Sequence, residues 1–100
     1  MAKRKASVSH RERLIEELRD DPKLAVEYLN SAVEDNDPQT YLLALRSVAE
    51  ALGMTKVAKA AGIPRESLYR ALSPTGNPRL STLHAVLRAA GLKLAVARAG

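Results

Sequence analysis

The sequence predicts an all-α protein, a small helical bundle that ends in one short strand. Its 100 residues and 46% apolar content fit a single compact domain. Apolar residues recur at helical spacing along most of the chain. Because the chain lacks Trp and Phe, leucine, valine and alanine must fill the core, and small alanines let helices approach closely.

N-capping residues mark three helices in the first half of the chain. Ser9 and Glu12 have the spacing of a capping box and begin a short helix. Residues 21–22 and 37–38 are both Asp-Pro, an N-cap followed by proline at the first helical position, and each pair begins another helix. Gly53 is the predicted C-cap of the third helix.

Three shorter helices follow in the second half. Thr55 is predicted to cap a helix that ends before Gly62. The next helix covers residues 64–72, beginning with a proline. The turn-rich loop of residues 73–78 then leads to the last helix, which Gly91 closes.

The break at Gly62 is typical of a helix-turn-helix. Two short helices that cross at a wide angle need a residue at their junction that tolerates positive φ, and Gly62 provides it. Val57 and Ala58 are expected to face inward from the first helix, and Leu68 and Ala71 from the second.

The other face of the second helix is the predicted DNA-reading surface. Arginine can bind guanine in a bidentate manner, glutamate can accept from cytosine N4, and tyrosine can contact phosphate or a thymine methyl group. Each of these side chains also has a plainer interpretation. The glutamate would stabilise the start of the helix, the tyrosine would cover the turn, and the arginines would be solvated surface charges. The four residues that share this face are Arg65, Glu66, Tyr69 and Arg70.

Residues on either side of this helix are candidate phosphate contacts. As a predicted N-cap, Thr55 leaves helix N–H groups free to meet a phosphate, as anions commonly do at helix starts. Lys56, Asn77 and Arg79 are further candidates. Together with the reading face, these residues predict double-stranded DNA as a partner.

Charge is divided unevenly along the chain. Residues 14–50 carry three basic and nine acidic side chains, a net charge of −6. Residues 51–100 carry eight basic side chains and one acidic side chain, Glu66, a net charge of +7. A basic half with one carboxylate favours a polyanionic partner, although charges that merely keep the chain soluble are an alternative.

Several classes of protein are not expected. No apolar run approaches the roughly 18 residues that span a membrane, and no signal peptide is recognised. The absence of cysteine suits a cytoplasmic protein. His10 and His84 lack partners at metal-ligand spacing, and no nucleophile–base pair or phosphate-binding glycine loop is present, so no metal, cofactor or enzymatic activity is predicted.

The segment of residues 92–96 alternates large apolar residues with others, which predicts a strand. Leu92, Leu94 and Val96 share one side of it. A lone strand cannot satisfy its backbone hydrogen bonds, so antiparallel pairing with the same strand of a second copy is expected. The resulting homodimer would present two reading helices to half-sites about 34 Å apart. The alternative is an irregular segment folded over the helices.

Residues 38–91 resemble the Cro/C1-type (XRE-like) helix-turn-helix domain of phage repressors. That pattern has an alanine in the first helix, a glycine at the turn, and a Pro-x-Leu-x-Thr-Leu segment that ends in Gly-Leu. The matching residues are Ala58, Gly62, Pro78, Leu80, Thr82, Leu83, Gly91 and Leu92. The residues before this domain predict a flexible basic arm (1–8) and N-terminal helices (9–37), and the resemblance implies a DNA-binding domain (38–98) that forms one compact unit with 9–37.

A narrower resemblance covers nearly all of residues 21–96. The segments AVEYLNSAVEDNDP (25–38), GMTKVA (53–58), RESLYRALS (65–73) and GNP (76–78) are similar to short addiction module antidote proteins, the HigA-like antitoxins of type II toxin–antitoxin pairs. This resemblance implies an antitoxin that neutralises a small RelE/ParE-like toxin and represses its own operon. It assigns DNA reading to the four residues named above. Pro64 departs from the Ser or Thr cap of many members.

The acidic segment 14–50 has two interpretations. Such toxins are usually basic, so an acidic helical surface would steer and cover one. Alternatively, the acidic face keeps the domain soluble and orients it on DNA. A stand-alone phage-repressor-like regulator without a toxin, and a structural adaptor whose basic half meets RNA or a protein, also remain open.

Overall fold

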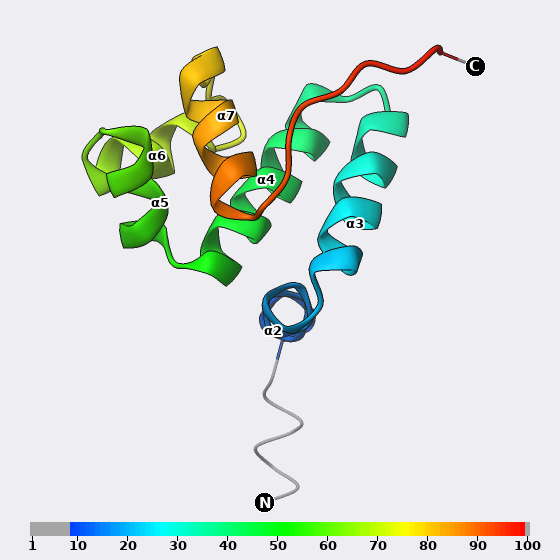
Figure 1. Cartoon of the computed structure of the whole chain (residues 1–100), viewed down its shortest axis with the longest axis horizontal. Coiled ribbons are helices and arrows are strands. Elements are labelled where there is room, and N and C mark those ends of the chain that lie inside the picture. Colours follow the sequence, from blue (N-terminus) through cyan, green and yellow to red (C-terminus); the bar gives the residue numbers. More distant parts are fainter. Residues whose placement is uncertain (1–8, 100) are drawn as a thin grey trace, which may run out of the picture.

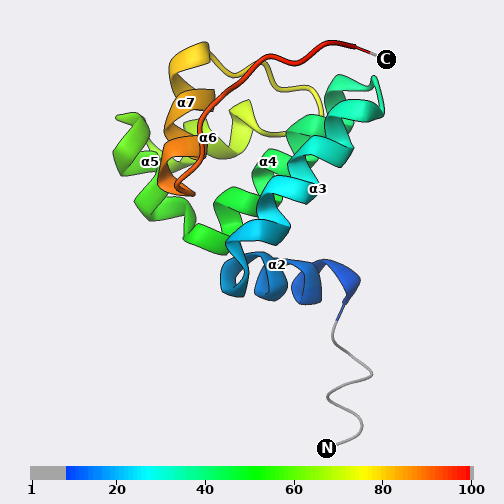
Figure 2. The ribbon, with the colours of Figure 1, turned by 45° about the vertical axis from the view of Figure 1, so that its right-hand side comes forward.

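Six helices make up the computed structural model, which describes residues 9–99 (Figure 1). In chain order they are α2 (His10–Asp20), α3 (Pro22–Glu34), α4 (Pro38–Leu52), α5 (Met54–Ala61), α6 (Arg65–Ala71) and α7 (Leu80–Ala89). α4 is central: it contacts α2 and α3 as well as α5 and α7. In Figure 2, α2 crosses beneath the other helices. The predicted basic arm, residues 1–8, lies outside the described residues.

The capping signals of the first three helices form as predicted. The N–H of Glu12 donates to Ser9 Oγ at 3.0 Å, and the N–H of Ser9 donates to Glu12 Oε1 at 2.9 Å, which completes the capping box. The carboxylates of Asp21 and Asp37 each accept a 3.0 Å hydrogen bond from the N–H two residues on. Because these bonds satisfy N–H groups that a helix start leaves unpaired, they determine where α2, α3 and α4 begin.

Leucine, valine and alanine form the core, as the composition predicts. Leu45 and Val48 of α4 are at most 2% exposed. The same core cluster includes three side chains from the later helices that have no exposed surface: Val57 of α5, Leu68 of α6 and Val86 of α7. Each such side chain contributes about 1.5–3 kcal/mol by leaving water, so the short helices α5 and α6 are held mainly by this packing.

The turn at Gly62 has the predicted geometry. Gly62 adopts φ 70° and ψ 30°, in the left-handed region that glycine tolerates best. Its N–H donates to the carbonyl of Lys59 at 3.1 Å, and the N–H of Ile63 donates to the carbonyl of Ala58 at 3.1 Å. These bonds close α5 and let the chain turn at once into α6.

The predicted C-terminal strand is not seen. Residues 92–99 leave α7 as an irregular segment that runs towards the turn between α3 and α4 (Figures 1 and 2). The N–H of Leu92 donates to the carbonyl of Leu87 at 2.7 Å, and residues 93–99 make no hydrogen bond within the described chain. A strand requires a neighbour for its backbone groups, and residues 9–99 of a single chain provide none.

Candidate nucleic-acid interface

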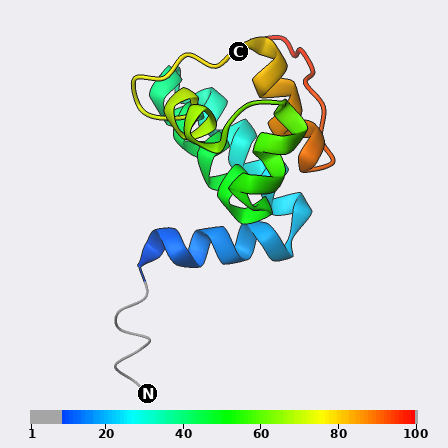
Figure 3. The same ribbon diagram turned by 90° about the vertical axis from the view of Figure 1, so that its left-hand side faces the viewer.

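α6 presents its charged side chains to solvent and its apolar side chains to the core. Arg65, Glu66 and Arg70 are exposed, whereas Leu68 is completely buried and Leu72, just after the helix, is 1% exposed. Helical spacing therefore separates the two faces as the sequence predicts. Figure 3 views the molecule from the side that carries α5 and α6, with α2 crossing at the bottom.

Tyr69 is the exception on this face, because its ring is half-buried against the core. Two guanidinium groups lie over the ring: Arg46 Cζ is 5.5 Å and Arg65 Cζ is 5.7 Å from its centroid. Both distances are within the range of cation–π contacts. Tyr69 therefore packs against the bundle while its ring also supports Arg65, one of the predicted reading residues.

Arg46, on α4, is a residue that sequence reasoning missed. Its Nε lies 3.6 Å from Glu50 Oε2, and the N–H groups of Arg11 donate to Glu50 Oε1 at 2.6 Å and to Ser47 Oγ at 2.9 Å. The i, i+4 spacing of Arg46 and Glu50 could have indicated the ion pair. The contact with Tyr69 could not be found in this way, because it depends on how α6 packs near α4.

The start of α5 differs from the prediction. Thr55 is not the N-cap, because α5 begins at Met54 and Gly53 occupies the cap position with φ 105°. Gly53 both ends α4 and precedes α5, so no residue remains for a separate cap. Thr55 instead lies in the first turn, and its Oγ1 accepts a hydrogen bond from Arg65 Nη1 at 3.4 Å. The structure therefore brings together two predicted DNA contacts.

The other predicted phosphate contacts are exposed. Lys56 follows Thr55 in the first turn of α5, and Asn77 and Arg79 lie in the loop before α7. Within residues 9–99, no hydrogen bond or ion pair connects these three side chains to α6. Their long or polar side chains are therefore available to an external ligand.

The loop between α6 and α7 is held by a close backbone approach. The N–H of Gly76 donates to the carbonyl of Ser73 at 2.8 Å. A Cβ at position 76 would lie 2.1 Å from the carbonyl oxygen of Ala71, so only glycine fits without a shift. This approach holds the loop that carries Asn77 and Arg79 against the end of α6.

Acidic side chains are concentrated in one part of the molecule, where α2 and α3 also carry the exposed basic residues Arg13, Arg19 and Lys23. The exposed acidic side chains of residues 14–50 lie on α2, on α3 and on the turns that follow them. Exposed basic side chains follow α5, α6, α7 and the C-terminal segment, with Glu66 as the one carboxylate. Figure 1 shows α4 between these two groups of helices. The arrangement suits a polyanion on the second group.

Two other kinds of site are not found in the part of the chain that the structure describes. No group of three or more His, Asp or Glu side chains there is arranged to hold a metal ion. None of the six described helices is long and apolar enough to cross a bilayer.

Comparison with known proteins gives two matches. A family model described as a probable addiction module antidote protein matches residues 11–98. An uncharacterized protein of Haemophilus influenzae (strain ATCC 51907 / DSM 11121 / KW20 / Rd) is 42% identical over 69 residues, which are 69% of this chain and 71% of that protein. No solved structure matches the chain. The family match begins in α2 and ends in the C-terminal segment, so it includes both groups of helices.

Proposed function

The chain belongs to the family of probable addiction module antidote proteins, and from this premise we propose that it is a DNA-binding antitoxin of a type II toxin–antitoxin pair. Membership implies a cognate toxin partner, and antidote families are generally not enzymes. The finer features are our proposal: a HigA-like protein with a Cro/C1-type helix-turn-helix that acts in the cytoplasm, neutralises a small RelE/ParE-like toxin and represses its own operon.

The exposed arginines of α6 are the observation that supports DNA binding most directly. Arg65 and Arg70 project from a short helix that follows a glycine turn and buries Leu68 on its other side. A helix of this kind fits the major groove, where arginine donates two hydrogen bonds to guanine. Glu66 and Tyr69 complete the proposed reading face. The proposed phosphate contacts are Thr55, Lys56, Asn77 and Arg79.

We propose that the DNA-binding form is a homodimer. In residues 93–99 the backbone has no hydrogen-bond partner within the described chain, so pairing with the same segment of a second copy would satisfy it. Leu92, Leu94 and Val96 would form the dimer strand. Two copies of α6 would then read half-sites about one turn of DNA apart, as symmetric repressors do.

The charge division supports separate surfaces for DNA and toxin. α2 and α3 carry exposed carboxylates, which would steer a basic toxin to the half of the molecule away from α6. One antitoxin could then hold its toxin and its operator together. This assignment depends on the toxin being basic, as proteins that act on RNA usually are.

Co-expression with the product of the neighbouring gene tests the antitoxin role. We expect this chain to restore growth and to co-purify with that product. DNA binding is tested separately, on a duplex from the gene's own upstream region, where affinity should fall steeply with added salt. Operator binding without growth rescue would favour a stand-alone repressor. Growth rescue without operator binding would contradict the proposed repression.

A further inference from the structure

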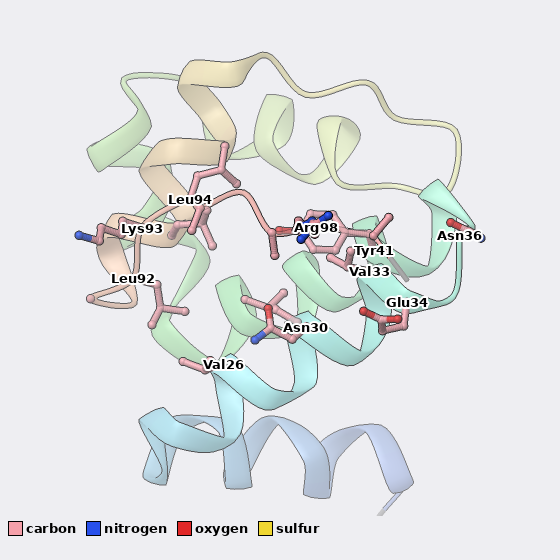
Figure 4. Close-up of a pocket in the computed structure, with 16 residues that line it drawn as sticks. Val26, Asn30, Val33, Glu34, Asn36, Tyr41, Leu92, Lys93, Leu94 and Arg98 are labelled. Atoms are coloured by element: carbon pink, nitrogen blue, oxygen red, sulfur yellow. The ribbon is translucent and has the colours of Figure 1, made fainter.

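A groove separates α3 from the C-terminal segment (Figure 4). Its volume is about 970 Å³. Val26 and Val33 of α3 are 39% and 54% exposed, and Leu94, which also lines the groove, is 46% exposed. Tyr41 is another lining residue, and burial raises the pKa of its hydroxyl group. The part of the groove wall formed by Tyr41 is therefore partly shielded from water. Exposed valine and leucine side chains therefore line part of the groove, beside polar residues such as Asn30 and Glu34.

The C-terminal segment is itself incomplete. Its residues 93–99 make no hydrogen bond within the described chain, and Val96 is 98% exposed. Lys93 and Arg98 line the groove together with Glu34 of α3, yet none of the ion pairs among residues 9–99 includes them. The chain thus carries an uncovered groove and an uncovered apolar strand-like segment side by side.

We propose that this groove is occupied by the C-terminal segment of a second copy of this chain, so that α3 forms part of the dimer interface. The proposal rests on the homodimer proposed above and adds a second surface to it. Antiparallel pairing puts the partner's segment about 4.8 Å from its counterpart. Each segment would then form a wall of its own groove and fill the groove of the other copy, as a two-fold interface requires.

The direction of the C-terminal segment predicts which residues of the two copies would lie near each other. In Figure 4 the segment runs from Leu92, close to Val26, to Arg98, on the side of Val33 and Glu34. An antiparallel partner runs the opposite way. Its residue 96 would therefore lie towards Val26, and its residue 93 towards Glu34. Because successive side chains of a strand point to opposite faces, the side chains of residues 92, 94 and 96 face α3 together, and this apolar face matches Val26 and Val33.

Interface size also argues for the groove. A stable interface buries about 800 Å² per partner and involves about 20–30 residues a side. The predicted strand, residues 92–96, is too short to supply this surface alone. The residues of α3, of the turn that follows it and of α4 that line the groove would add to the surface that the strand supplies.

Substitution on α3 separates this interface from a dimer held by strands alone. Val33→Asp puts a charge into the groove, and we expect the dimer Kd to rise on the order of 100-fold, because a buried unpaired charge is strongly unfavourable. Leu43→Asp is the matched control: Leu43 is 49% exposed on α4 and does not line the groove. Its Kd should stay within about 3-fold of the unmodified chain. Analytical ultracentrifugation measures Kd, and circular dichroism checks the fold of both variants.

Cross-linking tests the same contact in the folded protein. The chain has no cysteine, so single cysteines can be placed without background. We expect mixed Val26→Cys and Val96→Cys chains to form a covalent dimer under mild oxidation, since a disulfide requires Cα atoms within about 7 Å. A mixture of Leu43→Cys and Val96→Cys should not form that product.

Four results would overturn the inference. If Val33→Asp dimerises as tightly as Leu43→Asp, the groove is outside the interface while the homodimer stands. The same conclusion follows if the only covalent dimer joins two Val96→Cys chains. If Val33→Asp instead keeps the dimer but loses the co-purifying toxin, the groove belongs to the toxin. A monomeric unmodified chain would also contradict the proposed homodimer, while operator binding and growth rescue would still test the remaining function.

Discussion

The two halves of the molecule begin their helices in different ways. α2, α3 and α4 each start at a residue whose side chain accepts a hydrogen bond from a backbone N–H; these residues are Ser9, Asp21 and Asp37, respectively. α5, α6 and α7 have no side-chain cap. Buried residues such as Leu68 and Val86 hold these helices in place. Local sequence therefore specifies where the helices of the first half begin, whereas the helices of the second half depend on packing against the rest of the chain.

The balance of charge changes at the same place as capping, although α2 and α3 also carry the exposed basic residues Arg13, Arg19 and Lys23. The capped helices α2 and α3 carry the exposed carboxylates, and the uncapped helices α5–α7 carry exposed lysines and arginines. Uncapped helix starts leave N–H groups free, which favours a phosphate ligand in a basic environment. A side-chain cap would occupy the same groups. The difference between the halves is therefore consistent with the proposed DNA interface in the second half.

Gly76→Ala should give the largest effect, a loss of about 2–3 kcal/mol in the free energy of unfolding. The new Cβ would lie 2.1 Å from the carbonyl oxygen of Ala71, so the loop or the end of α6 must move. Chemical denaturation measures this free energy. The control is Thr75→Ala, an exposed neighbour, which should change it by less than about 0.5 kcal/mol. Equal effects of the two substitutions would contradict the close approach.

Arg70→Ala should weaken operator binding by about 2 kcal/mol, with little loss on random DNA, if Arg70 reads a base. Because its side chain is exposed, the thermal midpoint should hardly change. Binding to both duplexes at one salt concentration measures the difference. Arg88→Ala, an exposed arginine at the other end of α7 from the loop, is the control. An equal loss on both duplexes would identify Arg70 as a phosphate contact instead.

Asp37→Ala should cost about 1 kcal/mol of stability, because it removes the cap of the central helix α4. Thr55→Ala is the informative comparison, since Thr55 lies inside α5 and caps nothing. We expect it to cost less than about 0.5 kcal/mol. Urea denaturation of both variants measures the two costs. If Thr55→Ala destabilised the protein as much as Asp37→Ala, the difference in capping between the halves would be wrong.

Arg46→Met should give the smallest effect, a loss of about 0.5–1 kcal/mol in operator affinity, by removing one guanidinium group from the ring of Tyr69. Glu50 keeps its hydrogen bond from Arg11, so the connection between α2 and α4 remains. NMR of the Tyr69 ring protons reports the change at the ring directly. Unchanged ring shifts would show that Arg46 does not position Tyr69 and that the two halves meet without this contact.

Features that depend on a few neighbouring residues were predictable from the sequence. The capping box at Ser9 and the Asp-Pro starts of two helices needed only spacing within one turn. The left-handed turn at Gly62 and the separation of Leu68 from Arg65 and Arg70 followed from the conformational freedom of glycine and from helical periodicity. The strand predicted for residues 92–96 failed because no neighbouring strand is present in residues 9–99, and the cap predicted for α5 failed because two signals competed. At α5, Gly53 took the cap position that Thr55 was expected to fill.

The sequence by itself therefore determined a helical chain, the starts of its first three helices, its glycine turn and its uneven distribution of charge, because each of these depends on neighbouring residues or on totals. Only the tertiary structure decided that Arg46 lies over Tyr69, that Gly76 meets the carbonyl of Ala71, and that residues 92–99 leave a groove beside α3. These contacts join parts of the chain that periodicity does not relate. They form because burying the common core around α4 brings the helices together.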